Sequence, residues 1–216
     1  MSQHVVVTGA TGYMGRSLIP TLLERGHRVT AVVRPQSVSR VPEGCLVQVG
    51  DALEGDSWCG CLSRGDTLVH LVGVPHPSPA KAKEFLEIDR RAAMEAIRVA
   101  GEAGAGHLVY LSVAQPAPVM KAYLAVRAEC EAKLRGSGLR ATIVRPWYVL
   151  GPGHRWPYAL LPLYWMAERF PAMQSGARRL GLVTLCQMTK ALVQAVENPP
   201  EGVRIMDVPA IRAARI

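Results

Sequence analysis

Short runs of apolar, mostly β-branched residues alternate with longer amphipathic segments over the first two thirds of the chain. Each run ends at glycine, at proline or in a polar cluster, as strands buried inside a protein usually do. The intervening segments are too long for hairpins, and several carry apolar residues at helical spacing, so crossovers must join the runs into a parallel sheet. The expected strands are residues 4–8, 28–33, 46–49, 67–72, 108–111 and 141–144.

Amphipathic segments between and after these strands are expected to form helices that cover the sheet. Together they predict an α/β fold, a Rossmann-type doubly wound parallel sheet, in a single domain of residues 1–216. After the sixth strand, prolines and aromatic residues replace the alternation, and residues 146–216 are expected to form a small C-terminal cap on the substrate side. The expected helices are residues 14–25, 80–103, 123–135 and 184–197.

The bulk composition excludes several classes of function. The formal charge is +8, but the basic residues are scattered, so we expect no nucleic-acid partner. The 5 cysteines are odd in number and lack the spacing of metal ligands, which predicts neither a disulfide framework nor a metal site. Without a long apolar stretch or a secretory signal, we expect a cytoplasmic monomer or homodimer that has no transmembrane segment.

A glycine-rich turn connects the first expected strand to the first expected helix. Glycine in such a turn allows a tight bend, a close approach of the backbone to a pyrophosphate, and close packing of helix on strand. The N-terminus of the helix then offers free N–H groups to the phosphates. We therefore expect a nicotinamide dinucleotide to bind at Gly9, Thr11, Gly12, Tyr13, Met14 and Gly15.

The end of the second expected strand indicates which dinucleotide binds. NAD sites usually place an acidic residue there, to accept hydrogen bonds from the ribose hydroxyls. This chain has no acidic residue between Glu24 and Glu43, and the strand is followed by Arg34. An arginine offers a planar, permanently charged fork to a 2′-phosphate. The sequence therefore predicts NADP(H) as the preferred cofactor and NAD(H) as a weaker one; a surface arginine without a ligand is the alternative interpretation.

At this point the chain resembles the short-chain dehydrogenase/reductase superfamily, in its atypical NAD(P)H-binding branch, which includes NmrA-like regulators and small flavin-reductase-like proteins. The resemblance covers almost the whole chain. It implies an NADP-dependent oxidoreductase that acts on an unknown small-molecule substrate. The matching segments are Thr8–Gly15, Gly50–Asp51, Leu71–Gly73, Leu111–Ser112, Tyr123 with Glu129, Ser137–Pro146 and Gly151–Gly153.

The resemblance also implies how the cofactor is held. It implies that Asp51, followed by Ala52, hydrogen-bonds the adenine amino group, although an aspartate that caps the following turn is an equal alternative. It places the strand end at Leu71, Val72 and Gly73 along the ribose of the cofactor. It places Pro146 and Trp147 beside the nicotinamide.

The same resemblance implies catalytic roles, with one departure. Ser112 matches the serine that polarises the substrate, and Tyr123 matches the tyrosine that transfers a proton to or from the substrate oxygen. The family places a lysine four residues after that tyrosine, and this chain has Arg127. Arginine keeps the positive charge, but it does not release a proton at ordinary pH, so a relay through a neutral amine is not available.

Three functions therefore stay open. The first is the oxidoreductase, the second a non-catalytic NADP(H)-binding redox sensor or assembly protein, and the third an enzyme like the nucleotide-sugar epimerases and dehydratases. Loops at the carboxyl edge of the sheet are expected to face the substrate, although a plain surface turn is the alternative for each. The substrate-side candidates are His76, Tyr148, His154 and Trp156.

Overall fold

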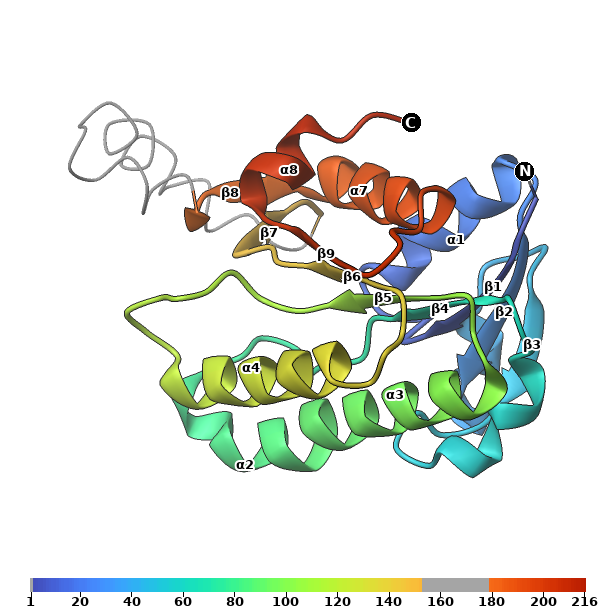
Figure 1. Ribbon diagram of the computed structural model, residues 1–216, viewed down its shortest axis with the longest axis horizontal. Coiled ribbons are helices and arrows are strands. Elements are labelled where there is room, and N and C mark those ends of the chain that lie inside the picture. Colours follow the sequence, from blue (N-terminus) through green and yellow to red (C-terminus); the bar gives the residue numbers. More distant parts are fainter. Residues whose placement is uncertain (1, 153–178) are drawn as a thin grey trace.

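The computed structural model describes residues 2–152 and 179–216, and Figure 1 shows a central sheet between two layers of helices. Seven strands in this part of the chain form one parallel sheet in the order β3-β2-β1-β4-β5-β6-β9. This confirms the predicted α/β fold of Rossmann type. The strands are β1 (His4–Thr8), β2 (Arg28–Val33), β3 (Leu46–Val49), β4 (Thr67–His70), β5 (His107–Leu111), β6 (Ala141–Val144) and β9 (Val203–Met206).

Helices cover both faces of the sheet. Helices α1 (Gly15–Glu24) and α7 (Leu185–Glu197) lie on one face, and α3 (Arg91–Ala103) and α4 (Lys121–Arg135) lie on the other (Figure 1). The helix predicted over residues 80–103 is divided: short α2 (Ala82–Glu84) leads into a π-helical turn, Phe85–Arg90, before α3 begins. A short helix, α8 (Val208–Ala213), follows β9. Among the described residues, no helix is long and apolar enough to cross a membrane.

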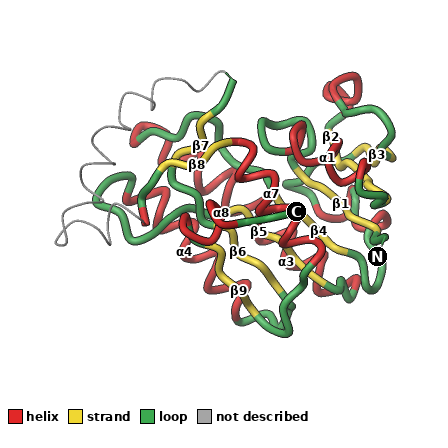
Figure 2. Tube along the Cα trace, turned by 90° about the horizontal axis from the view of Figure 1, so that it is seen from above, coloured by secondary structure: helices red, strands yellow, loops and turns green. Residues whose placement is uncertain are grey.

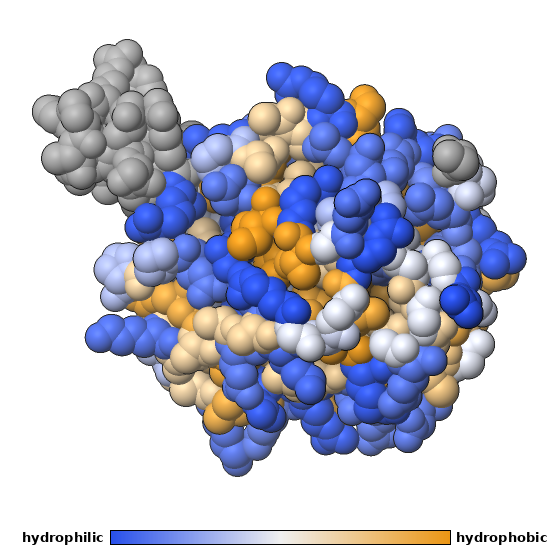
Figure 3. All heavy atoms as spheres, viewed as in Figure 1, coloured by the Kyte–Doolittle hydropathy of each residue, from blue (hydrophilic) through white to orange (hydrophobic). Residues whose placement is uncertain are grey.

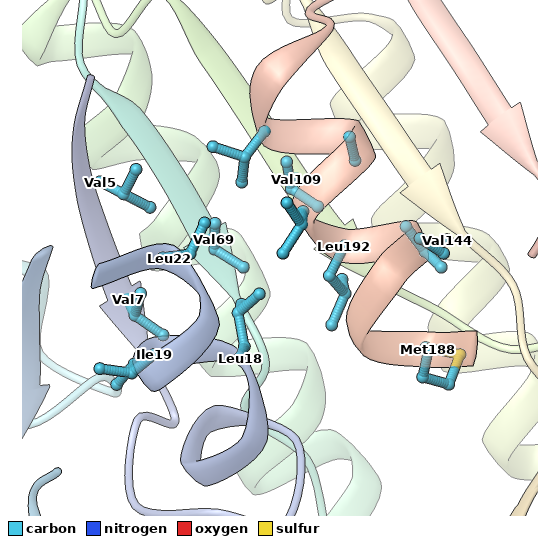
Figure 4. Close-up of a cluster of buried hydrophobic side chains, with 14 of the residues drawn as sticks. Val5, Val7, Leu18, Ile19, Leu22, Val69, Val109, Val144, Met188 and Leu192 are labelled. Carbon is cyan, nitrogen blue, oxygen red and sulfur yellow. The ribbon is translucent and has the colours of Figure 1, made fainter. Parts of the chain in front are cut away.

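Five strands, β1, β2, β4, β5 and β6, supply apolar side chains to two cores, one on each face of the sheet. Val5 and Val7 of β1 point toward α1, where Ile19 and Leu22 lie, and they belong to the same core as Leu192 of α7 (Figure 4). Val6 lies between them in sequence and joins the core on the opposite face. This alternation follows from the two-residue period of a strand. Full burial of each such side chain contributes about 1.5–3 kcal/mol to the stability of the fold. The packed strands therefore hold their ends, and the loops that follow them, in fixed positions.

After β6, in the part of the chain where a cap was expected, α7 packs on the sheet and β9 extends it. The sequence analysis did not predict β9. It is a short edge strand whose Val203 and Ile205 are partly exposed. Figure 3, which has the same view as Figure 1, shows apolar side chains near the centre of this face, among hydrophilic ones. Exposed, irregularly patterned edge strands give a weak sequence signal.

A separate two-stranded parallel sheet is formed by β7 (Tyr148–Leu150) and β8 (Leu182–Thr184). Figure 2 shows this pair away from β1, β2 and β3. Thr184 ends β8 and caps α7: its hydroxyl accepts from the Gln187 N–H, and the Gln187 side chain accepts from the Thr184 N–H. In this small sheet, β7, which follows β6, pairs with β8, which leads into α7. It therefore links the end of β6 to the helix layer that contains α1 and α7.

Candidate cofactor site

The glycine-rich turn lies where the strand order reverses, between β1 and β4. In doubly wound sheets the carboxyl ends of the strands leave a crevice at this point, and ligands bind there. Gly9 follows β1 with a φ of +78°, a backbone conformation that favours glycine. A Cβ at Gly9 would lie 2.9 Å from the carbonyl carbon of Leu71, the first residue after β4. The sequence-predicted Gly9 and Leu71 are therefore in contact at the crevice.

The other two glycines of the turn differ in how closely the backbone surrounds them. A Cβ at Gly15, the first residue of α1, would collide with the Ala10 carbonyl and lie 2.6 Å from the Gly9 oxygen. Gly12 is exposed, and its N–H donates to the Gly9 oxygen at 3.0 Å, which closes the turn. The three glycines thus hold the turn tightly against β1 and leave its outer surface open to a ligand.

Free backbone donors lie on this turn. Hydrogen bonds occupy the N–H groups of Gly12 and Arg16, but those of Thr11 and Met14 have no acceptor within residues 2–152 and 179–216. The positive end of the α1 dipole adds to these donors. Together they fit a diphosphate, whose oxygens only accept hydrogen bonds. The Tyr13 hydroxyl, in contrast, packs against Gly151 after β7, where a Cβ would collide with it.

At the end of β2, Arg34 is exposed, and its side chain forms no hydrogen bond or ion pair with the described residues. The 3₁₀ turn Pro35–Arg40 follows it. The Ser37 N–H donates to the Arg34 carbonyl at 2.8 Å, and the Arg40 guanidinium donates to the Ser37 hydroxyl at 2.6 Å. A second cation and a hydroxyl, which the sequence analysis did not single out, therefore belong to the same turn as Arg34.

After β3, Asp51 caps the turn that follows it, which is the alternative role that the sequence allows. Its Oδ1 accepts from the Leu53 N–H at 3.0 Å, which caps the turn that contains Ala52. Both Asp51 and Ala52 are partly exposed. The structure therefore accounts for Asp51 as a turn residue, and contact with adenine stays a proposal.

Past the end of β4, the chain is held by an ion pair inside the protein. Arg127 of α4 donates to Asp89, and Asp89 accepts from the Val74 N–H at 3.0 Å. Arg127 also donates to the Leu111 carbonyl at 2.8 Å and to the Tyr110 hydroxyl at 3.2 Å. Burial raises the pKa of the Asp89 carboxyl, and Arg127 and the Val74 N–H act in the opposite direction. Burial also raises the pKa of Tyr110, which stays a neutral phenol.

Tyr123 and Arg127 lie together, as the spacing of one helical turn predicts. The guanidinium carbon of Arg127 is 5.2 Å from the centre of the Tyr123 ring. On another side this ring packs on Phe85, with the ring centres 4.9 Å apart. Tyr123 itself is only partly buried, at the beginning of α4.

Ser112, the third catalytic candidate, is buried and donates to Glu131 at 2.6 Å. Glu131 lies one turn beyond Arg127 in α4 and also accepts from Gln115 and Arg145. Burial raises the pKa of Glu131, but the hydrogen bonds from Arg145 and Ser112 lower it by more. The net shift of the pKa is downward, so the group is a carboxylate. The Ser112 proton is therefore directed into the protein, and its oxygen lone pairs are what it can offer elsewhere.

The candidates for the nicotinamide side and the substrate side follow β6 and β4. Pro146 is buried, with its carbonyl accepting from the Ala114 N–H at 2.8 Å. Trp147 and Tyr148 follow it and contact each other edge to face, with ring centres 5.5 Å apart. His76 is exposed in the loop after β4, with a φ of +49°. His154 and Trp156 lie outside the described residues.

Sequence reasoning missed the two buried carboxylates, Asp89 and Glu131. Both lie within helices among several acidic residues, and nothing local distinguishes them from surface ones. One signal was present: Tyr123, Arg127 and Glu131 recur every four residues, on one face of α4. Two opposite charges on the helix face that carries Tyr123, the candidate catalytic residue, indicate buried partners.

Comparison with known proteins identifies the family of this chain. The profile of an NAD(P)H-binding family matches residues 9–155. The chain is 27% identical over 209 residues to the ceramide reductase of Caulobacter vibrioides, across 94% of this chain and 64% of that protein. It is 28% identical over 228 residues to a 3-diazoavenalumate denitrifying reductase of Streptomyces, across 92% of this chain and 74% of that protein.

Among solved structures, the fold matches the Bordetella bronchiseptica enzyme WbmH in complex with NAD+, with a TM-score of 0.71 and 19% identity over 96% of this chain and 76% of that one. The profile match includes the turn at Gly9–Gly15, the strand end at Gly73 and the α4 face. The chain therefore belongs to the NAD(P)H-binding family.

Proposed function

We propose that this protein is an NADP(H)-dependent oxidoreductase that acts on a small molecule. The observation that carries the proposal is the turn at Gly9–Gly15, where three glycines hold open a surface with free backbone donors, at the point where the sheet reverses its strand order. The ceramide reductase and the 3-diazoavenalumate denitrifying reductase among its relatives support the same reaction class.

Binding is divided between two ends of the crevice. The amides of Thr11 and Met14, with the α1 dipole, bind the diphosphate. Arg34 binds the 2′-phosphate through its free guanidinium, and Arg40 adds a second positive charge from the same turn. Because no carboxylate follows β2 to bind the ribose hydroxyls, NAD(H) binds more weakly.

The bound nicotinamide supplies or accepts the hydride, and the protein positions it against the substrate and excludes water. Tyr123 moves the proton at its phenolic oxygen, because it is the partly exposed member of the α4 face. Arg127 keeps a positive charge 5.2 Å from its ring. Ser112 offers oxygen lone pairs from the end of β5, and the substrate lies toward Trp147, Tyr148 and the loop of His76.

The test is NADPH oxidation with separate panels of quinones, aldehydes, ketones and flavins. We expect turnover in at least one panel, and we expect Tyr123→Phe to abolish it while NADPH binding is kept. Phenylalanine preserves the ring contacts with Phe85 and Arg127, so this variant removes only the hydroxyl. Turnover that survives in Tyr123→Phe contradicts the assigned proton donor.

A second candidate, a non-catalytic NADP(H) sensor or regulatory protein, is favoured by one observation. Arg127 stands where the family has a lysine, and its donors are directed to Asp89, Tyr110 and Leu111. Tight NADPH binding with no oxidation in any panel would select this candidate.

A further inference from the structure

The guanidinium group of Arg127 is directed into the protein. Its Nη1 donates to the Leu111 carbonyl at 2.8 Å and to the Tyr110 hydroxyl at 3.2 Å, and its Nη2 donates to Asp89. The side chains of Arg127 and Asp89 are 4% and 0% exposed. The Arg127 guanidinium therefore binds neighbouring groups of the protein.

These neighbours include the ends of two adjacent strands. The ladder between β4 and β5 ends at the pair His70 and Tyr110. Beyond that pair, Asp89 holds the β4 side through the Val74 N–H at 3.0 Å, and Arg127 holds the β5 side through the Leu111 carbonyl. The ion pair thus continues the connection between the two strands where their backbone hydrogen bonds stop.

Gly73 lies directly over this ion pair. A Cβ at Gly73 would lie 2.5 Å from the Arg127 Nη2 and 3.2 Å from the Asp89 Oδ1. The other side of Gly73 is exposed. The ion pair of Asp89 and Arg127 therefore contacts Gly73 on its buried side and fixes the position of this backbone segment.

We propose that Asp89 and Arg127 form a clamp that positions the segment Leu71–Gly73 and the end of β5 for the nicotinamide half of the cofactor. Arg127 is then a positioning residue. Two charges buried in this way lose their hydration, so an apolar pair would hold the helices together as well or better. What the ion pair adds is directed bonds to Val74 and Leu111. The inference rests on the proposed function, because it assigns the clamp to one half of the same cofactor.

The division of the crevice into two halves gives a selective test. The phosphate turn and Arg34 bind the adenosine half, which 2′,5′-ADP reproduces without the nicotinamide. The clamp supports only the other half. Loss of the clamp therefore weakens NADPH binding and leaves 2′,5′-ADP binding unchanged, whereas a general loss of structure weakens both.

The experiment measures the Kd of both ligands by calorimetry for the wild-type protein, Asp89→Asn and Arg127→Met. We expect the Kd for NADPH to rise about tenfold or more in each variant, by displacement of the strand ends, and the Kd for 2′,5′-ADP to stay within about twofold. The matched control is Arg90→Gln. Arg90 forms an exposed ion pair with Glu129 at 2.7 Å between the same π-helical turn and α4, and its loss is expected to change neither Kd.

The outcomes are distinct. Unchanged NADPH binding in both variants, or an equal loss for NADPH and 2′,5′-ADP, overturns the clamp. If a single variant does not fold, the double variant Asp89→Asn/Arg127→Gln, which buries no charge, is used for the same comparison and is held to the same two criteria. A wild-type protein that binds neither ligand contradicts the proposed function itself, and the clamp's assignment to the cofactor fails with it.

Discussion

Ser112 and Glu131 form a 2.6 Å hydrogen bond in which the serine hydroxyl is the donor and the buried carboxylate the acceptor. The same carboxylate accepts from Arg145, which follows β6, and from Gln115, which lies beyond β5. One carboxylate of α4 therefore joins the ends of β5 and β6, beside the ends of β4 and β5 that Asp89 and Arg127 join. The helix face that carries Tyr123 is built on two buried charge clusters.

Glu131→Gln is expected to destabilise the protein by about 3 kcal/mol, because it leaves Arg145 without its buried counter-charge. Urea denaturation measures this free energy of unfolding. The control is Glu129→Gln on the same helix, whose ion pair with Arg90 is exposed, and its expected cost is about 0–1 kcal/mol. Equal costs for the two variants would show that Glu131 does not hold the strand ends.

Gly15→Ala is expected to cost about 1–3 kcal/mol of stability, because the added Cβ collides with the Ala10 carbonyl and forces α1 away from β1. Thermal denaturation shows this as a lower Tm. Gly60→Ala serves as the control, since no atom lies within 4 Å of the Cβ that it adds. A Tm of Gly15→Ala as high as that of the control would contradict the packing described for the turn.

Most of the sheet could be predicted from the sequence because the central strands are buried on both faces and read as continuous apolar runs. The strands β1, β2, β3 and β6 have the predicted bounds, whereas β4 ends at His70, two residues earlier than predicted. Past His70 the chain turns into the crevice, where Asp89 and Arg127 hold it in place of a ladder. An apolar run indicates burial, and after β4 Leu71 and Val72 stay partly buried although the pairing with β5 has stopped.

Candidate site residues could be selected from the sequence where they lie close together in the chain, and not where they depend on distant partners. The glycine turn and Arg34 each lie within a single loop, so the local sequence was sufficient to select them as candidates. Asp89 and Glu131 became visible only when the fold brought them to Arg127 and Arg145, 38 and 14 residues away. The hydrogen bond of the Ser112 hydroxyl could not be predicted for the same reason, since its acceptor, Glu131, lies 19 residues further along the chain.

Stability is expected to fall as the pH falls from 6.5 toward 3. Burial lowers the pKa of His70 and of His107 to about 3 in the folded protein, with Arg127 adding to the effect on His70 and Arg204 on His107. The unfolded chain therefore binds more protons than the folded one in this window, and each histidine contributes a slope of about 1.4 kcal/mol per pH unit.

Denaturation with urea between pH 7 and pH 5.5 measures this slope before the carboxylates titrate. In His70→Gln the slope below pH 6.5 is expected to fall by the contribution of one histidine. The glutamine amide also keeps a hydrogen bond within reach of Thr8, which now pairs with the His70 Nδ1 at 2.8 Å. An unchanged slope would mean that His70 is not held neutral.

Arg34→Ala is expected to remove the preference for NADP(H), because its guanidinium is the exposed cation at the end of β2 without a partner among residues 2–152 and 179–216. We expect NADPH to bind about tenfold or more weakly, and NADH binding to be nearly unchanged. Titrations of both cofactors against the wild type and the variant measure the ratio. Arg16→Ala, a change at an exposed arginine of α1, is the control and is expected to keep the preference.

The central claim is that the turn at Gly9–Gly15 binds the diphosphate of a nicotinamide dinucleotide, and calorimetric titration with NADPH tests it most directly. Gly12 is the matched site because it is exposed at the turn, so Gly12→Asp brings a carboxylate to the phosphates without disturbing the core. We predict a saturable heat of binding with one NADPH per chain for the wild type, and none for Gly12→Asp with an unchanged circular dichroism spectrum. A wild-type protein that gives no heat with either NADPH or NADH, or a Gly12→Asp variant that binds as the wild type does, would contradict the claim.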